Sequence, residues 1–437
     1  MQRQKTVAKW LAIILLVTIA VGAYIMYDAV YLEGGDTAAG DEPVTTPDTE
    51  PDPAPPETDP PFYTTLPRAA QTFAGIKVAH AGGEGDERVL ATVFTDGTAY
   101  VFFSSESSEY DCRGSGLYLA LHDGDSLISV TRFAAGSVTF GGAKLTSDGV
   151  AAAVSDGGTG TLFVFGTDGS VKGETSLPAF TSAFFLSHGG ELMLFLSNGT
   201  ALTCHTVQKG LSVTSSPFRL AGDRAVTEGF AAGEVFTLSA QRGEDTEIVT
   251  FSQENGFIVT ECYEKTSFRQ IVPVAGEDGA AFCLLGSKAS GMLLAVLSAS
   301  GEELSSATLE GGTEGALFGD GVSVILVRTG LTQTFCRHLD LIASAPTDLE
   351  VYGVAAVRES GGKRALVTRD AEGGVEVLLS SDGGDFVTLA ECSGGEGNVR
   401  AEFLDGDLVI SLSSSSREGI FFENFGAGDA YLLRLPA

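Results

Sequence analysis

The chain has 437 residues, of which 43% are hydrophobic, 56 are glycine and only 19% are charged, and its formal net charge is −31. A chain of this length can bury a large core, and its glycine-rich, lysine-poor composition favours short strands and tight turns over helices. The negative charge argues against nucleic acid and against a bare anionic membrane surface as partners.

The N-terminal region contains an apolar run at residues 10–27, WLAIILLVTIAVGAYIMY, which is just long enough to span a bilayer. Basic residues precede this run and acidic residues follow it, so the positive-inside rule places the N-terminus in the cytoplasm. A cleaved secretory signal is the alternative, because Val21-Gly22-Ala23 resembles a cleavage site, but the length of the run favours an uncleaved signal-anchor. Both interpretations place the rest of the chain outside the cytoplasm.

A proline-rich acidic segment follows at residues 33–61, with eight of the chain's 14 prolines and nine acidic residues. Such a composition cannot form a packed core and stays extended. We therefore predict a basic cytoplasmic tail at residues 1–9, a single-pass transmembrane anchor at 10–31, a disordered stalk at 32–69 and a folded extracellular domain at 70–437.

The folded domain repeats one unit, in which a turn glycine is followed at once by an apolar strand. Successive turn glycines are 41 to 52 residues apart, and five of the eight follow an aspartate, as suits tight hairpins: Gly97, Gly149, Gly190, Gly233, Gly279, Gly321, Gly362 and Gly406. A second hairpin, such as the one at residues 161–177, recurs within the units. Four strands per unit, a period above 40 residues and no clear helix are typical of propeller blades.

The units predict an all-β fold, a β-propeller of about eight four-stranded blades. The last unit ends one strand short, whereas residues 72–81 supply a surplus strand at the beginning. We expect this strand to complete the last blade and to close the ring, since pairing the two chain ends removes an exposed edge. A ring of seven blades stays open as an alternative, because boundaries taken from one sequence shift by several residues.

The domain resembles β-propeller repeat proteins at the level of architecture, without matching one family. Residues 380–387, SSDGGDFV, are similar to the Asp box of sialidases, although Val387 stands where that motif usually has tryptophan. The resemblance implies a hairpin turn, not catalysis.

No residue pattern indicates a catalytic, metal or cofactor site. The resemblance to sialidases implies an arginine cluster, a tyrosine with a glutamate partner and an aspartic acid, and no local context matches these. The five histidines form no paired ligand motif, and His122 and His188 are expected in turns. The six cysteines have no metal spacing and are expected mostly as buried thiols, with disulfides as the alternative outside the cytoplasm.

The candidate binding residues lie in the loops between the second and third strands of the first and last blades, which are the longest such loops. Because these blades are neighbours in a closed ring, the loops are expected to form one surface patch. Exposed aromatic residues beside arginine are common in binding hot spots, and here they are Tyr110, Arg113, Arg417, Phe421, Phe422 and Phe425. Ordinary solvated loops are the alternative interpretation.

The sequence thus predicts a membrane-anchored binding or scaffolding propeller for a protein or polysaccharide partner at the cell envelope. A glycan-active surface enzyme resembling sialidases, with its site in the central channel, is the alternative.

Overall fold

The computed structural model describes residues 67–437, apart from 96, 125, 189, 276–279, 320, 370–373, 393–394, 415–419, 421–423 and 426–427. The predicted tail, anchor and most of the stalk lie outside the described residues. The described part of the chain offers no apolar helix with the length that a membrane crossing needs.

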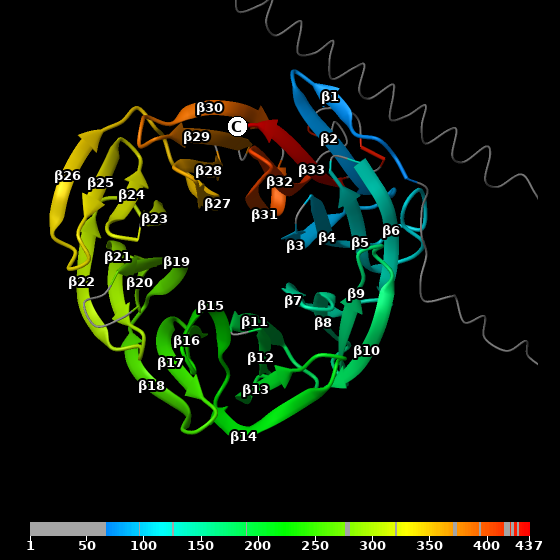
Figure 1. The fold of residues 1–437 in the computed structure, drawn as a ribbon, viewed down its shortest axis with the longest axis horizontal. Coiled ribbons are helices and arrows are strands. Elements are labelled where there is room, and N and C mark those ends of the chain that lie inside the picture. Colours follow the sequence, from blue (N-terminus) through cyan, green and yellow to red (C-terminus); the bar gives the residue numbers. More distant parts are fainter. Residues whose placement is uncertain are drawn as a thin grey trace, which may run out of the picture. The chain divides into compact units, whose positions relative to one another are not determined.

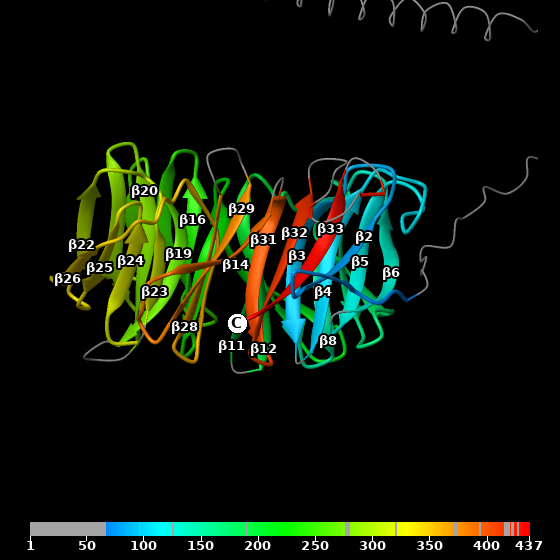
Figure 2. The same ribbon diagram turned by 90° about the horizontal axis from the view of Figure 1, so that it is seen from above.

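Eight antiparallel sheets are arranged around a central axis and form an eight-bladed β-propeller, as predicted (Figure 1). Seen from the side, the blades form a flat ring whose strands run between its two faces (Figure 2). The innermost strands are β3 (Arg88–Thr95), β7 (Thr139–Thr146), β11 (Ser182–His188), β15 (Ala225–Ala232), β19 (Ser267–Ala275), β23 (Ala316–Gly319), β27 (Gly353–Ser360) and β31 (Gly395–Leu404).

The second strands follow the turn glycines of the repeat. They are β4 (Thr98–Ser105), β8 (Gly149–Ser155), β12 (Glu191–Ser197), β16 (Val235–Arg242), β20 (Ala280–Lys288), β24 (Val324–Arg328), β28 (Lys363–Arg369) and β32 (Asp407–Ser414). The third strands are β5 (Gly116–Asp123), β9 (Gly160–Phe165), β13 (Ala201–Val207), β17 (Asp245–Ser252), β21 (Gly291–Ser298), β25 (Leu331–Phe335), β29 (Val375–Ser381) and β33 (Asp429–Pro436).

The outer strands of the first seven blades are β6 (Ser126–Ala135), β10 (Val171–Leu177), β14 (Val213–Ala221), β18 (Gly256–Tyr263), β22 (Glu303–Glu310), β26 (Leu341–Pro346) and β30 (Val387–Cys392). The hairpin at residues 161–177 corresponds to β9 and β10, the third and fourth strands of the second blade, as expected.

The ring closes between the two ends of the domain. Strand β2 (Ile76–Gly82) pairs with β33 and completes the last blade, as predicted, while β1 (Gln71–Phe73) adds a fifth strand outside it. The sequence indicated one strand at residues 72–81, but Ala74 and Gly75 both have positive φ and turn the chain back. The closure therefore consists of a hairpin, not a single strand.

The core lies between the blades. The buried side chains that the structure describes form eight clusters, one at each contact between neighbouring blades. On β4, Val101 and Phe103 pack toward the last blade, whereas Tyr100 and Phe102 pack toward the second. Because successive side chains point to opposite faces and both faces are buried, the second strands read as continuous apolar runs.

Candidate functional site

The loops of blades 1 and 8 meet where the ring closes. We call this region the seam and define it by Arg68, His80, residues 83–87, residues 106–115 and the described residues of 424–431. Its backbone is joined by hydrogen bonds from the Glu87 N–H to Gly428 O (3.3 Å) and from the Asp111 N–H to Gly82 O (3.0 Å). The three segments therefore form one surface.

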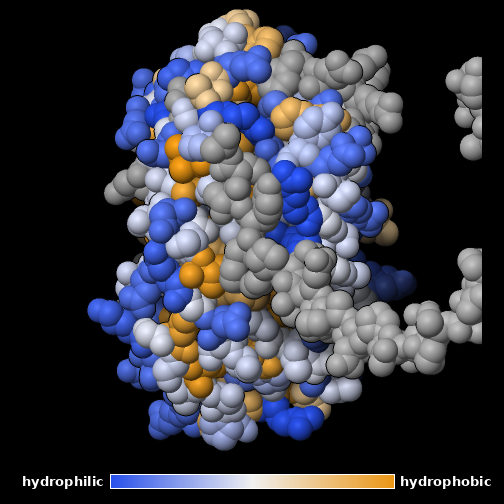
Figure 3. Space-filling view, turned by 90° about the vertical axis from the view of Figure 1, so that its right-hand side faces the viewer, coloured by the Kyte–Doolittle hydropathy of each residue, from blue (hydrophilic) through white to orange (hydrophobic). Residues whose placement is uncertain are grey.

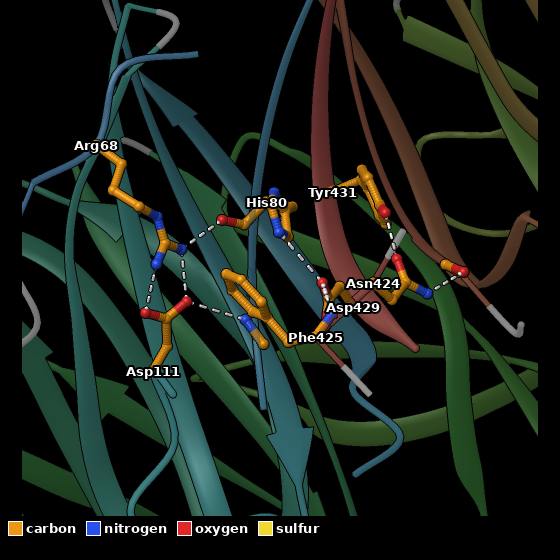
Figure 4. Close-up of polar contacts among 9 residues, drawn as sticks. Arg68, His80, Asp111, Asn424, Phe425, Asp429 and Tyr431 are labelled. Atoms are coloured by element: carbon orange, nitrogen blue, oxygen red, sulfur yellow. Dashed lines mark hydrogen bonds and ion pairs between the residues drawn. The ribbon is translucent and has the colours of Figure 1, made fainter. Parts of the chain in front are cut away.

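Arg68 ties the start of the described chain to the seam (Figure 4). Its guanidinium donates to both carboxylate oxygens of Asp111, at 2.8 and 2.6 Å, and to His80 O at 2.9 Å. It also lies 5.1 Å from the centre of the Phe425 ring. The sequence assigned Arg68 to the stalk, whereas here a bidentate ion pair, the stronger form of such contacts, fixes it on the propeller.

An aromatic stack lies beside this ion pair. The rings of Tyr110 and Phe425 are 4.8 Å apart and nearly parallel, and Phe425 also contacts His80 at 4.6 Å. Tyr110 is 52% exposed and has a φ of 58°, a conformation that costs a residue with a Cβ about 1–2 kcal/mol. Strain of this kind is common at functional sites, so the position is a candidate binding residue.

Two fully buried carboxyl groups, those of Glu87 and Asp429, meet at Gly82 beside the stack. A Cβ at Gly82 would lie 1.9 Å from Oδ1 of Asp429 and 3.1 Å from Oε2 of Glu87, so only glycine fits there. Neither of these two oxygens has a hydrogen-bond partner in the described structure. Burial raises the pKa of Glu87 to about 7 and that of Asp429 to about 7, so each group holds a proton in mild acid.

The other oxygen atom of each carboxyl group accepts a hydrogen bond from a neighbouring residue. Ser105 donates to Oε1 of Glu87 at 2.6 Å, and the Phe425 N–H donates to Oδ2 of Asp429 at 3.1 Å. Nε2 of His80 lies 3.3 Å from the same oxygen, and burial together with the nearby Arg68 charge lowers the pKa of His80 to about 3. Because both carboxyl groups are fully buried, they can hold protons but cannot reach a substrate.

A cavity of about 470 Å³ lies inside the ring, along the inner strands of blades 4 to 8. Its charged residues are Glu228, Arg269, Glu314, Arg358, Glu359 and Arg400. Its volume is in the range of small-molecule sites. No group of three histidine, cysteine or acidic side chains that could hold a metal ion occurs in the described part of the chain.

Three of the six predicted binding residues can be placed. Tyr110 and Phe425 are brought together, as the adjacency of blades 1 and 8 required, and Arg113 is exposed in the same loop, with its N–H donating to Tyr118 Oη at 2.8 Å. The other three, Arg417, Phe421 and Phe422, lie outside the described residues. Whether the patch binds a partner stays a prediction.

Sequence reasoning missed Arg68, Glu87 and Asp429 in the seam and Glu228 and Arg400 in the cavity. None of them stands in a motif, and their neighbours in the fold are distant in the chain. It was also wrong about His122, which was expected in a turn and is buried in β5, where burial lowers its pKa to about 3. All six cysteines are free and four are buried, as expected.

Comparison with solved structures shows which fold this is. The chain resembles the Dos1 propeller (TM-score 0.51, 10% identity, 81% of this chain and 93% of that one). It is a β-propeller. It is similarly close to the computationally designed Ika8 protein (TM-score 0.51, 13% identity, 80% of this chain and 98% of that one). No family model matches the chain, and neither does any curated protein. Identities this low show a shared fold and nothing about ligands.

Proposed function

We propose that this propeller is a non-enzymatic binding module, held at the outer surface of a membrane by its N-terminal anchor and stalk, and that the seam carries its protein or polysaccharide partner. The observation that supports the seam most directly is Tyr110, an exposed aromatic ring held in a strained backbone conformation on top of Phe425. A rigid aromatic residue loses little conformational entropy on binding, which makes it a suitable anchor.

The side of the ring formed by blades 1 and 2 has a surface of mixed hydropathy. There, hydrophobic residues lie in patches among hydrophilic and intermediate ones (Figure 3). Apolar patches of limited size are normal on folded proteins. Binding is therefore better argued from individual side chains such as Tyr110 than from a broad apolar area.

The alternative, a glycan-active enzyme, is favoured by the arginines and glutamates of the cavity. Burial raises the pKa of Glu228 to about 7, in the range of a general acid. Yet the described residues that line the cavity include neither a tyrosine nor an aspartate, which the resemblance to sialidases would require. The binding module is therefore the preferred proposal.

Photo-crosslinking on intact cells tests the seam. The full chain and its Tyr110→Ala variant are compared with Tyr352→Ala, a matched control because Tyr352 is 53% exposed on another part of the ring. Loss of an anchor typically weakens binding by more than about 2 kcal/mol, roughly thirtyfold, whereas an exposed substitution changes stability by about 0.5 kcal/mol. Equal crosslinking of both variants to the same partner would exclude the seam.

A further inference from the structure

The cavity inside the ring has an uneven distribution of charge. Arg269 pairs with Glu314 at 2.6 Å, and Arg358 pairs with Glu402 at 2.5 Å, so two of the three arginines are neutralised. Arg400 is exposed and makes no ion pair or hydrogen bond with any residue that the structure describes. A guanidinium with free donors therefore faces the cavity of a protein whose net charge is −31.

Irregular strand pairing lies beside three of the charged residues of the cavity. The pairing of β15 with β16 shifts between Val226 and Glu228, and that of β31 with β32 shifts between Glu396 and Arg400. Arg269 is itself the extra residue of a bulge in β19. Bulges re-aim side chains and are common beside binding sites. Equivalent shifts occur in the inner strands of blades 1, 2 and 7, so the bulge is a feature of the repeat, which in blades 4, 5 and 8 coincides with a charged residue of the cavity.

Glu228 and Arg400 come from blades 4 and 8, on opposite sides of the ring (Figure 1). The positive charge of Arg400 opposes the rise in the pKa of Glu228, so the two groups influence each other across the cavity. They do not form an ion pair in the structure. The space between them can therefore hold a ligand that contacts both.

We propose that this cavity binds a small monocarboxylate that also carries hydroxyl or amide groups. The guanidinium of Arg400 holds the ligand's carboxylate by two parallel hydrogen bonds, the geometry that arginine and carboxylate favour. Glu228 bonds a hydroxyl or amide group at the other end. A dianion such as phosphate is disfavoured, because Glu228, Glu314 and Glu359 also line the cavity and nearly balance its arginines.

This site lies apart from the seam, so the two proposals succeed or fail independently. The competing explanation is structural: Arg400 and Glu228 only balance each other's charge. In that case, removing either charge lowers stability and the cavity takes up no carboxylate. Ligand binding and thermal stability therefore distinguish the two explanations.

Binding is measured on the full-length chain in detergent, by ligand-observed NMR, with D-glucuronate, N-acetylalanine and inorganic phosphate as probes. Glucuronate or N-acetylalanine is expected to bind the wild type, and the Arg400→Gln variant is expected to bind at least tenfold more weakly with an unchanged melting temperature. Arg400→Lys keeps the positive charge but cannot form the bidentate contact, so its affinity for the carboxylates should lie between those of the wild type and Arg400→Gln. The matched control is Arg88→Gln, an exposed arginine of β3 that does not line the cavity.

The pH dependence supplies a second readout. The groups that face Glu228 in the cavity are Arg269, Glu314, Arg358, Glu359 and Arg400. Because Glu228 gains a proton near pH 7, its repulsion of a carboxylate ligand weakens between pH 8 and pH 6. Affinity should rise by up to roughly tenfold over this range, and Glu228→Gln should abolish the change.

Three results would overturn the proposal. The first is no binding of either carboxylate at ~10 mM, a concentration roughly tenfold above a weak Kd of about 1 mM. The second is equal binding by Arg400→Gln and the wild type, and the third is tighter binding of phosphate than of both carboxylates. A fall in the melting temperature of Arg400→Gln without carboxylate binding by the wild type would establish the structural explanation.

Discussion

Glu87 and Asp429 illustrate how single residues set the pH dependence of this protein. The pKa of Glu87 rises from 4.5 to about 7 on folding. As the pH increases, the Glu87 carboxyl group therefore loses its proton at a lower pH in the unfolded chain than in the folded protein. Folding stability therefore falls between about pH 4.5 and pH 7, and above pH 7 the full cost of about 3 kcal/mol is present. The buried His80 and His122 act in the opposite direction, because their lowered pKa values destabilise the fold as the pH falls below 6.5.

The variant Glu87→Gln should therefore be more stable than the wild type at pH 8 and nearly equal to it at pH 5. The amide oxygen can still accept from Ser105, while the amide nitrogen can donate toward the free oxygen of Asp429. Melting temperatures across this pH range measure the effect, and the exposed Glu106→Gln, in a neighbouring segment of the seam, is the control. If the difference in stability between Glu87→Gln and the wild type does not depend on pH, the pKa of Glu87 is not raised in the folded protein.

The cysteines differ sharply in accessibility. Cys262 is exposed and Cys336 partly exposed, whereas Cys283 and Cys392 are buried and their pKa values are raised to about 12 by burial. Since the reagent must reach the thiolate, alkylation of the native protein at pH 8.5 should modify the accessible Cys262 and Cys336 and leave the buried thiols unmodified. Mass spectrometry should find six alkylated cysteines after unfolding without reductant; fewer would indicate disulfides.

At the scale of elements, the closure of the ring depends on β2. This strand covers the edge of β33 and buries Ile76, Val78 and Ala81 between blades. A chain beginning at residue 83 should lose about 5 kcal/mol or more of unfolding free energy, because an apolar side chain of this kind contributes about 1.5–3 kcal/mol and a sheet edge is exposed. Denaturant titration measures the loss.

A chain beginning at residue 67 is the control for this truncation, since it keeps Arg68 and the whole closing hairpin. It should match the full-length chain in its unfolding midpoint. If the chain beginning at residue 83 unfolds at that same midpoint, β2 does not stabilise the ring, and closure depends on the packing of blades 1 and 8 alone.

At the scale of the whole molecule, the proposed topology places one compact ring outside the cell on an extended acidic segment. Propeller blades pair nearly all their strands and resist proteolysis, whereas an extended segment is cut readily. Protease added to intact cells should therefore release a fragment that begins between residue 33 and Arg68. Recovery of the uncut domain in the cytoplasmic fraction would contradict an external location.

The architecture could be predicted from the sequence because its signals are local. A turn such as Asp-Gly and the strand after it involve neighbouring residues, and the apolar runs of the second strands directly reflect burial on both faces. Eight such signals at similar spacing, together with the missing last strand, predicted the blade number and the closure by residues 72–81. The adjacency of Tyr110 and Phe425 followed from the closed ring.

The chemistry of the seam and the cavity was decided by the tertiary structure alone. Glu87 and Asp429 are far apart in the chain, and each looks like an ordinary acidic residue beside a turn; their raised pKa values arise only when closure buries them together at Gly82. Likewise, Glu228 and Arg400 line one cavity only because the closed ring arranges blades 4 and 8 around a common centre. Periodicity along a strand predicts which residues are buried, but the groups that meet across the ring depend on register and closure, which no local pattern contains.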